Sequence, residues 1–245
     1  MIYNFNTQPF IVINGVSSRT IKGLLIQKLP PITKPAIRTK AETVDGRDGD
    51  IVTTLGYAAY NKTLEIGLSY EYSIDDIISF FSSSGRVVFS NEPEKYYNFS
   101  IYAQVDFEKL IRFKTASVTF HVQPFKYSDI ESEKTFKESD FIGGNGVYVR
   151  NDGNIYSRPK ITITGAGLVR LYINNDRRLE LSLPTTGKTI IINSEDMNSY
   201  DENGNFLNRL VYGNYDEVRF IPGKNRVSFT GSVTEIKIDN YSRWL

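Results

Sequence analysis

The stretch that decides the fold is Thr63-Leu64-Glu65-Ile66-Gly67-Leu68-Ser69, in which apolar residues alternate with polar or small ones. Successive side chains of a β-strand point to opposite faces, so this period of two predicts a half-buried strand. The same alternation occurs at Ile101, Ala103 and Val105. Four further runs in the first half also read as strands, at residues 10–13, 24–29, 87–89 and 116–122. The first half is therefore predicted to be mainly β.

One helix is expected among these strands, near residues 74–83. Ser73 is placed to cap it, Asp76 follows three residues later as in a capping box, and Gly85 is the expected stop. An apolar stripe with helical spacing runs through Ile74, Ile77, Ile78 and Phe81. So short a helix is not stable alone, and we expect its stripe to lie on a sheet or on the mouth of a barrel.

The second half has a different pattern. Residues 130–138 form a mixed-charge segment with few apolar side chains, which we interpret as a domain joint. Short strands separated by Gly, Asn, Asp and Pro are predicted after it, at residues 160–164, 169–173, 179–183, 189–192, 218–221, 226–229 and 235–238. This spacing is typical of an antiparallel sandwich. Two domains follow, residues 1–135 and residues 136–245.

Composition limits the chemistry. The 245 residues carry a net charge of +1, no cysteine and one histidine. A neutral balance argues against a protein that coats nucleic acid, and the missing cysteines exclude disulfides and thiolate metal sites. The first residues, Met1–Asn6, lack the features of a secretory leader, and no run approaches the ~18 apolar residues of a membrane span. We expect a protein made in a cytoplasm, without catalytic residues, cofactor or metal.

Several motifs resemble chemical sites but are better explained as structural elements. The Thr185–Thr189 stretch lacks the earlier glycine of a phosphate loop and is predicted to be a hairpin turn. The acidic residues within 195–205 do not match a calcium loop and are predicted to be a solvated loop. His121 alternates with apolar neighbours, which places it on a surface or an interface. The adjacent carboxylates Asp75 and Asp76 fit the first turn of a helix better than acid–base chemistry.

Several stretches, taken in order, carry a resemblance. In the first half they are Asp45-Gly46-Arg47-Asp48-Gly49, Ser90-Asn91-Glu92-Pro93-Glu94-Lys95-Tyr96-Tyr97 and Val122-Gln123-Pro124-Phe125-Lys126-Tyr127. In the second half they include Ser157-Arg158-Pro159-Lys160-Ile161, Ile221-Pro222-Gly223-Lys224-Asn225 and Arg243-Trp244. Together they resemble the distal tail protein family (Dit) of long-tailed phages that infect Gram-positive bacteria.

The resemblance implies a structural virion protein. Residues 1–135 would form a split β-barrel with the helix near 74–83, and residues 136–245 a galectin-like β-sandwich. Six copies would close into a ring, or into two stacked rings, joining the tail-tube protein to the tail-associated hub protein. The outer domain would hold receptor-binding proteins or other baseplate parts. The protein would be assembled in the host cytoplasm and would end at the tail tip, with no membrane and no sequence-specific nucleic acid as partner.

Six residues are predicted to contact a neighbouring subunit or partner. Gly46 and Gly49 permit a tight turn at the tip of a hairpin or arm, where Arg47 and Asp48 could make charge-assisted contacts. The same four residues also fit an ordinary solvated turn. Tyr96 and Tyr97 fit an interface and the edge of a core equally well.

Three other functions were weighed. A carbohydrate-binding module is the main alternative, although the only tryptophan, Trp244, lies one residue from the end and fits the packing of a terminal strand better. A tail-tube subunit would leave residues 140–245 unexplained, because such subunits usually have a single domain. A hydrolase is disfavoured, since no nucleophile and base are found together.

Overall fold

The computed structural model describes residues 8–141 and 146–245, so the Met1–Asn6 stretch lies outside the described residues. The chain divides into two compact units, residues 1–129 together with Leu245, and residues 130–244. Both units are built mainly from antiparallel strands, which confirms the predicted fold class. In the described part of the chain, no helix is long and apolar enough to cross a membrane.

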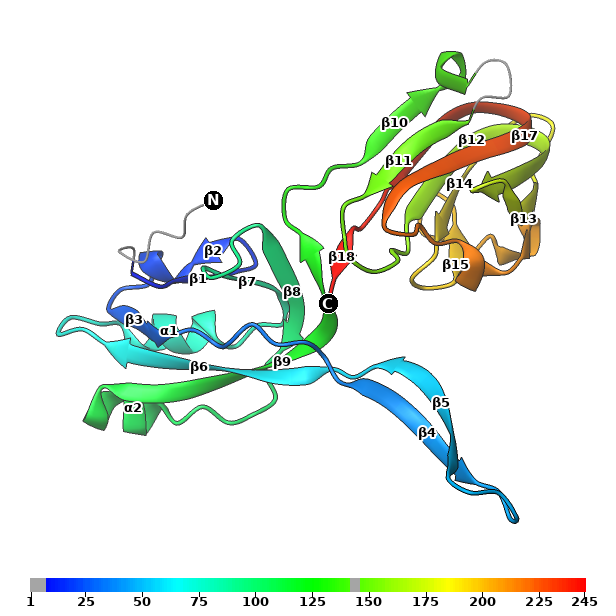
Figure 1. The fold of residues 1–245 in the computed structure, drawn as a ribbon. Coiled ribbons are helices and arrows are strands. Elements are labelled where there is room, and N and C mark those ends of the chain that lie inside the picture. Colours follow the sequence, from blue (N-terminus) through cyan, green and yellow to red (C-terminus); the bar gives the residue numbers. More distant parts are fainter. Residues whose placement is uncertain (1–7, 142–145) are drawn as a thin grey trace. The chain divides into compact units, whose positions relative to one another are not determined.

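The first unit is an antiparallel sheet with the strand order β2-β1-β7-β8-β9-β6-β3, which curls into a half-barrel (Figure 1). Inward-facing residues of its strands form one core, which includes Leu64, Ile66, Val118 and Phe120. Its strands are β1 (Ile11–Ile13), β2 (Val16–Ser17), β3 (Leu24–Lys28), β6 (Tyr60–Leu68), β7 (Gly85–Phe89), β8 (Lys95–Ser100) and β9 (Thr115–Ser128), with the short 3-10 turn η1 (Ser18–Thr20) after β2.

The predicted helix is confirmed as α1 (Ile74–Phe80), which buries Ile77 and Phe80 in the core of the half-barrel. Asp75 and Asp76 lie in its first turn, where negative charge is favourable. Ser73 occupies the N-cap position, but its side chain makes no capping hydrogen bond. The capping interaction expected there is therefore absent, although the helix begins where the sequence predicts it.

The strand predicted at residues 101–105 is wrong, because the chain is irregular there. Ile101 and Val105 still pack against the core, which explains their apolar character without a strand. A second helix, α2 (Phe107–Phe113), follows and was not predicted. The Asp106 carboxylate caps it by accepting a 2.8 Å hydrogen bond from the backbone N–H of Lys109.

The second unit is one antiparallel sheet folded over its own core. Two long strands, β12 (Lys160–Ile173) and β17 (Gly223–Asp239), pair with each other and run through both halves. One half adds β11 (Val147–Asn151), β13 (Asp176–Ser182) and β16 (Val211–Gly213); the other adds β10 (Lys134–Lys137), β14 (Lys188–Asn193) and β15 (Asn198–Tyr200). Inward residues of both halves belong to a single core, so the predicted antiparallel sandwich is confirmed.

Glycines sit where the two long strands bend between the halves. The register of β12 against β17 shifts at Gly165 and again between Ala166 and Arg170. Opposite, Gly231 has φ +103, and a Cβ there would lie 2.2 Å from the backbone oxygen of Leu168. Only a residue without a side chain fits this turn of the sheet.

Two expectations for this half need correction. Residues 134–137, interpreted as part of a joint, form β10, which pairs with β17. The strand predicted at residues 218–221 is wrong, since only Phe220 makes an isolated bridge, to Ser157, after the 3-10 turn η4 (Tyr215–Glu217). The remaining short elements are η2 (Glu138–Phe141), η3 (Asn208–Leu210) and β18 (Arg243–Trp244).

Candidate subunit interface: the β4–β5 arm

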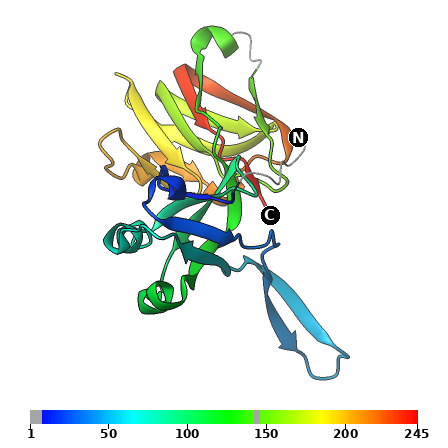
Figure 2. The same ribbon diagram turned by 90° about the vertical axis from the view of Figure 1, so that its left-hand side faces the viewer.

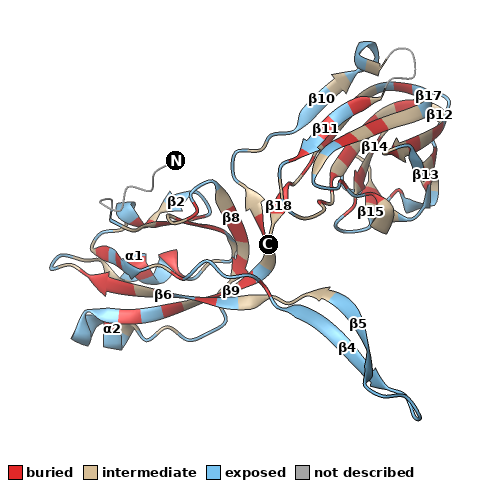
Figure 3. Ribbon diagram, viewed as in Figure 1, coloured by how far each residue is buried: buried red, intermediate tan, exposed pale blue. Residues whose placement is uncertain are grey.

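Strands β4 (Ile37–Thr43) and β5 (Asp50–Tyr57) pair only with each other and form a separate two-stranded sheet, which we call the arm. Figures 1 and 2 show the arm projecting from the half-barrel of the first unit. Every residue of β4 is exposed, and so are the first six of β5. The arm is accordingly pale blue along most of its length in Figure 3.

The arm exposes large apolar side chains on both of its faces. Val52 is 62% exposed and Leu55 is 53% exposed, and Ile37, Val44 and Ile51 are exposed as well. Ile51 and Val52 are neighbours in a strand, so they point to opposite faces. An isolated two-stranded ribbon is marginally stable in water, and apolar side chains grouped on it mark a contact surface. The arm therefore has the properties of an element that a partner covers.

The predicted contact residues Gly46, Arg47, Asp48 and Gly49 lie at the tip of this arm. Gly46 has φ +79 and Gly49 has φ +74, and the backbone N–H of Arg47 donates to the carbonyl of Val44 at 3.1 Å. The tight turn expected at the tip of a hairpin is thus present, and its two glycines supply the left-handed conformations that the turn needs. That these four residues contact a neighbour stays a prediction.

The two predicted tyrosines lie elsewhere, in β8, and the structure does not bring them together with the arm tip. Tyr97 is fully buried, and its ring meets Phe89 edge to face. Tyr96 is 5% exposed, stacks on Tyr127 with 5.5 Å between ring centroids, and has the Arg86 guanidinium over its ring. This burial agrees with the core-edge interpretation, and the interface interpretation of both tyrosines stays a prediction.

A buried charged cluster was missed by the sequence analysis. Lys62, Glu92 and Lys126 are all buried. The Glu92 carboxylate lies 2.9 Å from Lys126 Nζ and accepts a 2.7 Å hydrogen bond from the hydroxyl of Tyr97. Burial lowers the pKa of Lys62 to about 8, partly opposed by the charge of Glu92. Burial and the hydrogen bond to Glu92 both raise the pKa of Tyr97.

The other motifs behave as structural elements. The Asp201 carboxylate accepts hydrogen bonds from the backbone N–H groups of Asn203 and Asn205 and from the Asn205 side chain, which lowers its pKa. His121 points away from the core, and its Nδ1 lies 2.9 Å from the Asn61 side-chain oxygen. Residues 184–187 form a turn between β13 and β14, but the predicted hairpin is wrong, because these two strands each pair with β12 rather than with one another. Across the two described ranges, no three His, Cys, Asp or Glu side chains gather as metal ligands would.

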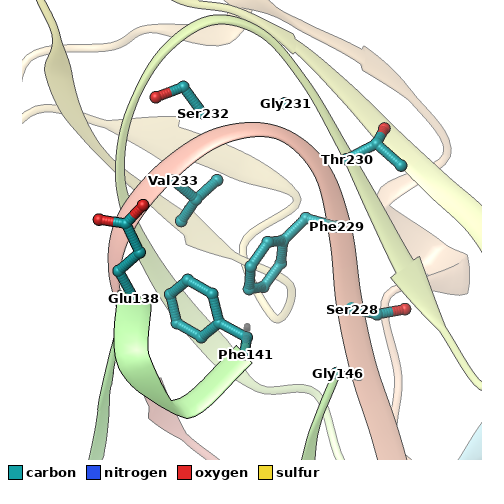
Figure 4. Close-up of a pocket in the computed structure, with 9 residues that line it drawn as sticks. All are labelled: Glu138, Phe141, Gly146, Ser228, Phe229, Thr230, Gly231, Ser232 and Val233. Atoms are coloured by element: carbon teal, nitrogen blue, oxygen red, sulfur yellow. The ribbon is translucent and has the colours of Figure 1, made fainter. Parts of the chain in front are cut away.

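A pocket in the second unit is lined mainly by residues of η2 and β17 (Figure 4). Phe141 and Phe229 meet there edge to face, with 4.8 Å between ring centroids. Glu138 is the one titratable side chain among the described residues that line it.

Comparison with known proteins identifies the fold. The half-barrel followed by the sandwich has the fold of a solved phage Dit protein, which confirms the resemblance at the level of the fold. The chain is similar to the Dit protein of phage SPP1, with 16% sequence identity, a TM-score of 0.65, and coverage of 98% of this chain and 100% of that one. SPP1 Dit is described as a paradigm of the hub adsorption apparatus in phages that infect Gram-positive bacteria.

Two structures of the phage P2 baseplate in its activated conformation, with Ca and with Sr, match at 12% identity and TM-scores of 0.47 and 0.44. Each match covers 94% of this chain and 97% of the matched baseplate chain. No protein-family profile matches the chain. No curated protein matches it either.

Proposed function

We propose that this protein is a structural subunit of a phage tail tip, where six copies form a ring, singly or as two stacked rings. The likeness to SPP1 Dit over 98% of the chain supports the proposal. The observation that carries it is the exposed arm. A ring needs one surface of each copy to fit a different surface of the next, and a projecting ribbon with exposed apolar side chains can supply the first of these.

In this proposal the two parts of the chain have different tasks. Residues 1–135 form the ring, with Gly46 to Gly49 at the tip of the arm reaching the neighbouring copy. Residues 136–245 form a galectin-like domain that holds receptor-binding proteins or other baseplate parts. The ring joins the tail-tube protein to the tail-associated hub protein at the tail tip of a virion assembled in the host cytoplasm. The role is structural and requires no catalysis or cofactor.

Solution mass tests the ring. Light scattering of the purified chain, followed by negative-stain imaging of the same peak, should give six or twelve subunits and annular particles. A chain that stays monomeric at high concentration, and that forms no annular particles with co-expressed tail-tube and hub proteins, would overturn the proposal.

An armless variant sharpens this test. Ile37 and Tyr57 are paired at the base of the arm, so Asn-Gly can replace residues 38–56 as a two-residue hairpin turn. This variant should remain folded and become monomeric. Val52→Asp should weaken the ring without removing the arm, whereas the control Leu168→Asp, which changes an exposed apolar side chain of the second unit, should leave it intact.

A carbohydrate-binding module remains the second candidate because the second unit exposes an aromatic side chain beside a cation. Tyr148 is 53% exposed on β11, and the Lys224 ammonium lies 3.8 Å from its ring centroid. Binding of host-surface saccharides by the wild type, lost in Tyr148→Ala, would favour this function. Saccharide binding would be compatible with a ring, whereas the absence of a ring together with such binding would favour the module alone.

A further inference from the structure

The segment that leads from the half-barrel into the arm is held by side chains rather than by a strand ladder. This connector, residues 29–36, joins β3 to β4 and contains Pro30, Pro31 and Pro35. Proline has no backbone N–H, so the segment cannot pair as a regular strand. Its carbonyl oxygens nevertheless accept hydrogen bonds from other parts of the first unit.

Three side chains bind carbonyls along the connector. Asn91 Nδ2 donates to the Pro30 carbonyl at 3.0 Å, and Lys62 Nζ donates to the Pro31 carbonyl at 2.7 Å. The Tyr60 hydroxyl reaches the Thr33 carbonyl at 3.4 Å. Lys62 makes the shortest of these contacts and is the charged donor, so it is the strongest of the three.

Lys62 is an unusual residue for its position. It is 3% exposed, and within residues 8–141 and 146–245 its ammonium forms no ion pair, since Glu92 is paired with Lys126. Aromatic rings surround it instead, with Tyr97 closest at 4.9 Å from Nζ to the ring centroid. A buried ammonium is costly, and an apolar side chain of similar size would pack there without that cost. Stability therefore does not account for a lysine here, but its bond to the connector does.

Both strands of the arm are linked to β6. Strand β5 of the arm leads directly into β6, because β5 ends at Tyr57 and β6 begins at Tyr60. Strand β4 of the arm follows the connector, which Lys62 of β6 binds at Pro31. At the base of the arm, the backbone N–H of Ala58 donates to the carbonyl of Ala36 at 2.8 Å and joins the segment after β5 to the connector before β4.

We propose that Lys62 is a positioning residue that pins the connector and thereby fixes the direction in which the arm leaves the first unit. The inference rests on the proposed function, since the direction of the arm matters only when the arm must reach a neighbour. A pinned arm meets that neighbour without losing further conformational freedom, which favours closure of a ring.

The absence of cysteine allows a direct test on the full-length chain. Spin labels at Thr53→Cys on the arm and Ser117→Cys on β9, both exposed positions, give a distance distribution by double electron–electron resonance. Dilution with unlabelled protein removes signals between subunits. Lys62→Met should at least double the width of the distribution without lowering the thermal midpoint. The matched control Lys126→Met removes the other buried lysine of the cluster, which binds Glu92, and should keep the width of the wild type.

Equal widths of the distance distribution in the wild type and in Lys62→Met would overturn the proposal. Asn91→Ala removes the neighbouring donor without touching a buried charge and should also broaden the distribution, which keeps the test open if Lys62→Met does not fold. These outcomes are independent of the ring. A wild type that stays monomeric and forms no annular particles with co-expressed tail-tube and hub proteins, but that has a narrow distribution, would contradict the proposed function and leave the role of Lys62 standing.

Discussion

Tyr97 and Glu92 form a buried hydrogen bond in which the tyrosine hydroxyl donates to one carboxylate oxygen at 2.7 Å. Lys126 Nζ binds the other oxygen at 2.9 Å. The turn that carries Glu92 is thereby tied to β8 through Tyr97 and to β9 through Lys126. A single carboxylate thus links three segments of the half-barrel core, and its removal should be felt by all of them.

Glu92→Gln is expected to lower the free energy of unfolding of the first unit by about 3–5 kcal/mol, because it leaves the buried Lys126 without its ion-pair partner. Tyr97→Phe, which removes only the donated hydrogen bond, should cost about 1.5–3 kcal/mol. Urea denaturation followed by circular dichroism measures both. The control is Glu65→Gln, whose exposed pair with Lys28 should contribute less than about 1 kcal/mol. Equal effects of the two glutamate variants would contradict the buried role of Glu92.

Stability should rise between about pH 8 and pH 10 because of Lys62. Its pKa is about 8 in the folded chain against an ordinary 10.5, so the unfolded chain binds more protons in this window. We expect a gain of about 2 kcal/mol from pH 7 to pH 9.5. Above pH 10 two tyrosines oppose this gain. Burial raises the pKa values of Tyr60 and Tyr97 in the folded chain, so both ionise at lower pH in the unfolded chain.

The check is the same denaturation experiment repeated across pH. Glu92 and Lys126, the other charged groups of the cluster, remain in Lys62→Met, so this variant isolates the contribution of Lys62. Its stability should be flat over the window in which that of the wild type rises. A rise of equal size in both proteins would show that another group titrates.

Alternation in the sequence predicted the core strands, because burial of one face of a strand requires apolar side chains at every second position. Leu64 and Ile66 on β6 and Val118 and Phe120 on β9 are all fully buried, as their period of two requires. Counted in steps of two along β6, Lys62 lies on the same inward face as Leu64. Counted in the same way along β9, Lys126 lies on the same inward face as Phe120. A lysine at an inward position was the signal for the buried cluster.

The elements that the sequence did not predict are those that bury few side chains in a core. Residues 37–43 and 50–55 are exposed on both faces, so no apolar alternation marks β4 or β5, and only the glycine turn between them was visible. Helix α2 has seven residues and one buried side chain, Leu110, which is too little to show a helical period.

Gly231→Ala should destabilise the second unit by about 3 kcal/mol, since the new Cβ would meet the backbone of Leu168 and the residue would keep a positive φ. Backbone cannot move aside as the end of a flexible side chain can. The control is Gly204→Ala, which has φ +83 but open space around its Cβ, and should cost only about 1–2 kcal/mol. Urea unfolding followed by circular dichroism measures both costs. Equal costs for the two variants would mean that the bend relaxes around the added methyl group.

Arg47→Ala should weaken assembly while leaving the fold unchanged. Arg47 is exposed at the tip of the arm, and in the described part of the chain it forms no ion pair, so its loss should change the thermal midpoint by less than about 2 °C. A charge-assisted contact with the neighbouring copy would be lost at each interface, at about 1.5–3 kcal/mol, which corresponds to association weaker by about 10-fold to 150-fold. Sedimentation across a concentration series measures this shift. Arg209→Ala, an exposed arginine of η3 in the second unit, is the matched control and should assemble as the wild type does. If both variants assemble normally, the tip does not use Arg47 to contact its neighbour, and the apolar side chains of the arm, tested by Val52→Asp, would carry the interface alone.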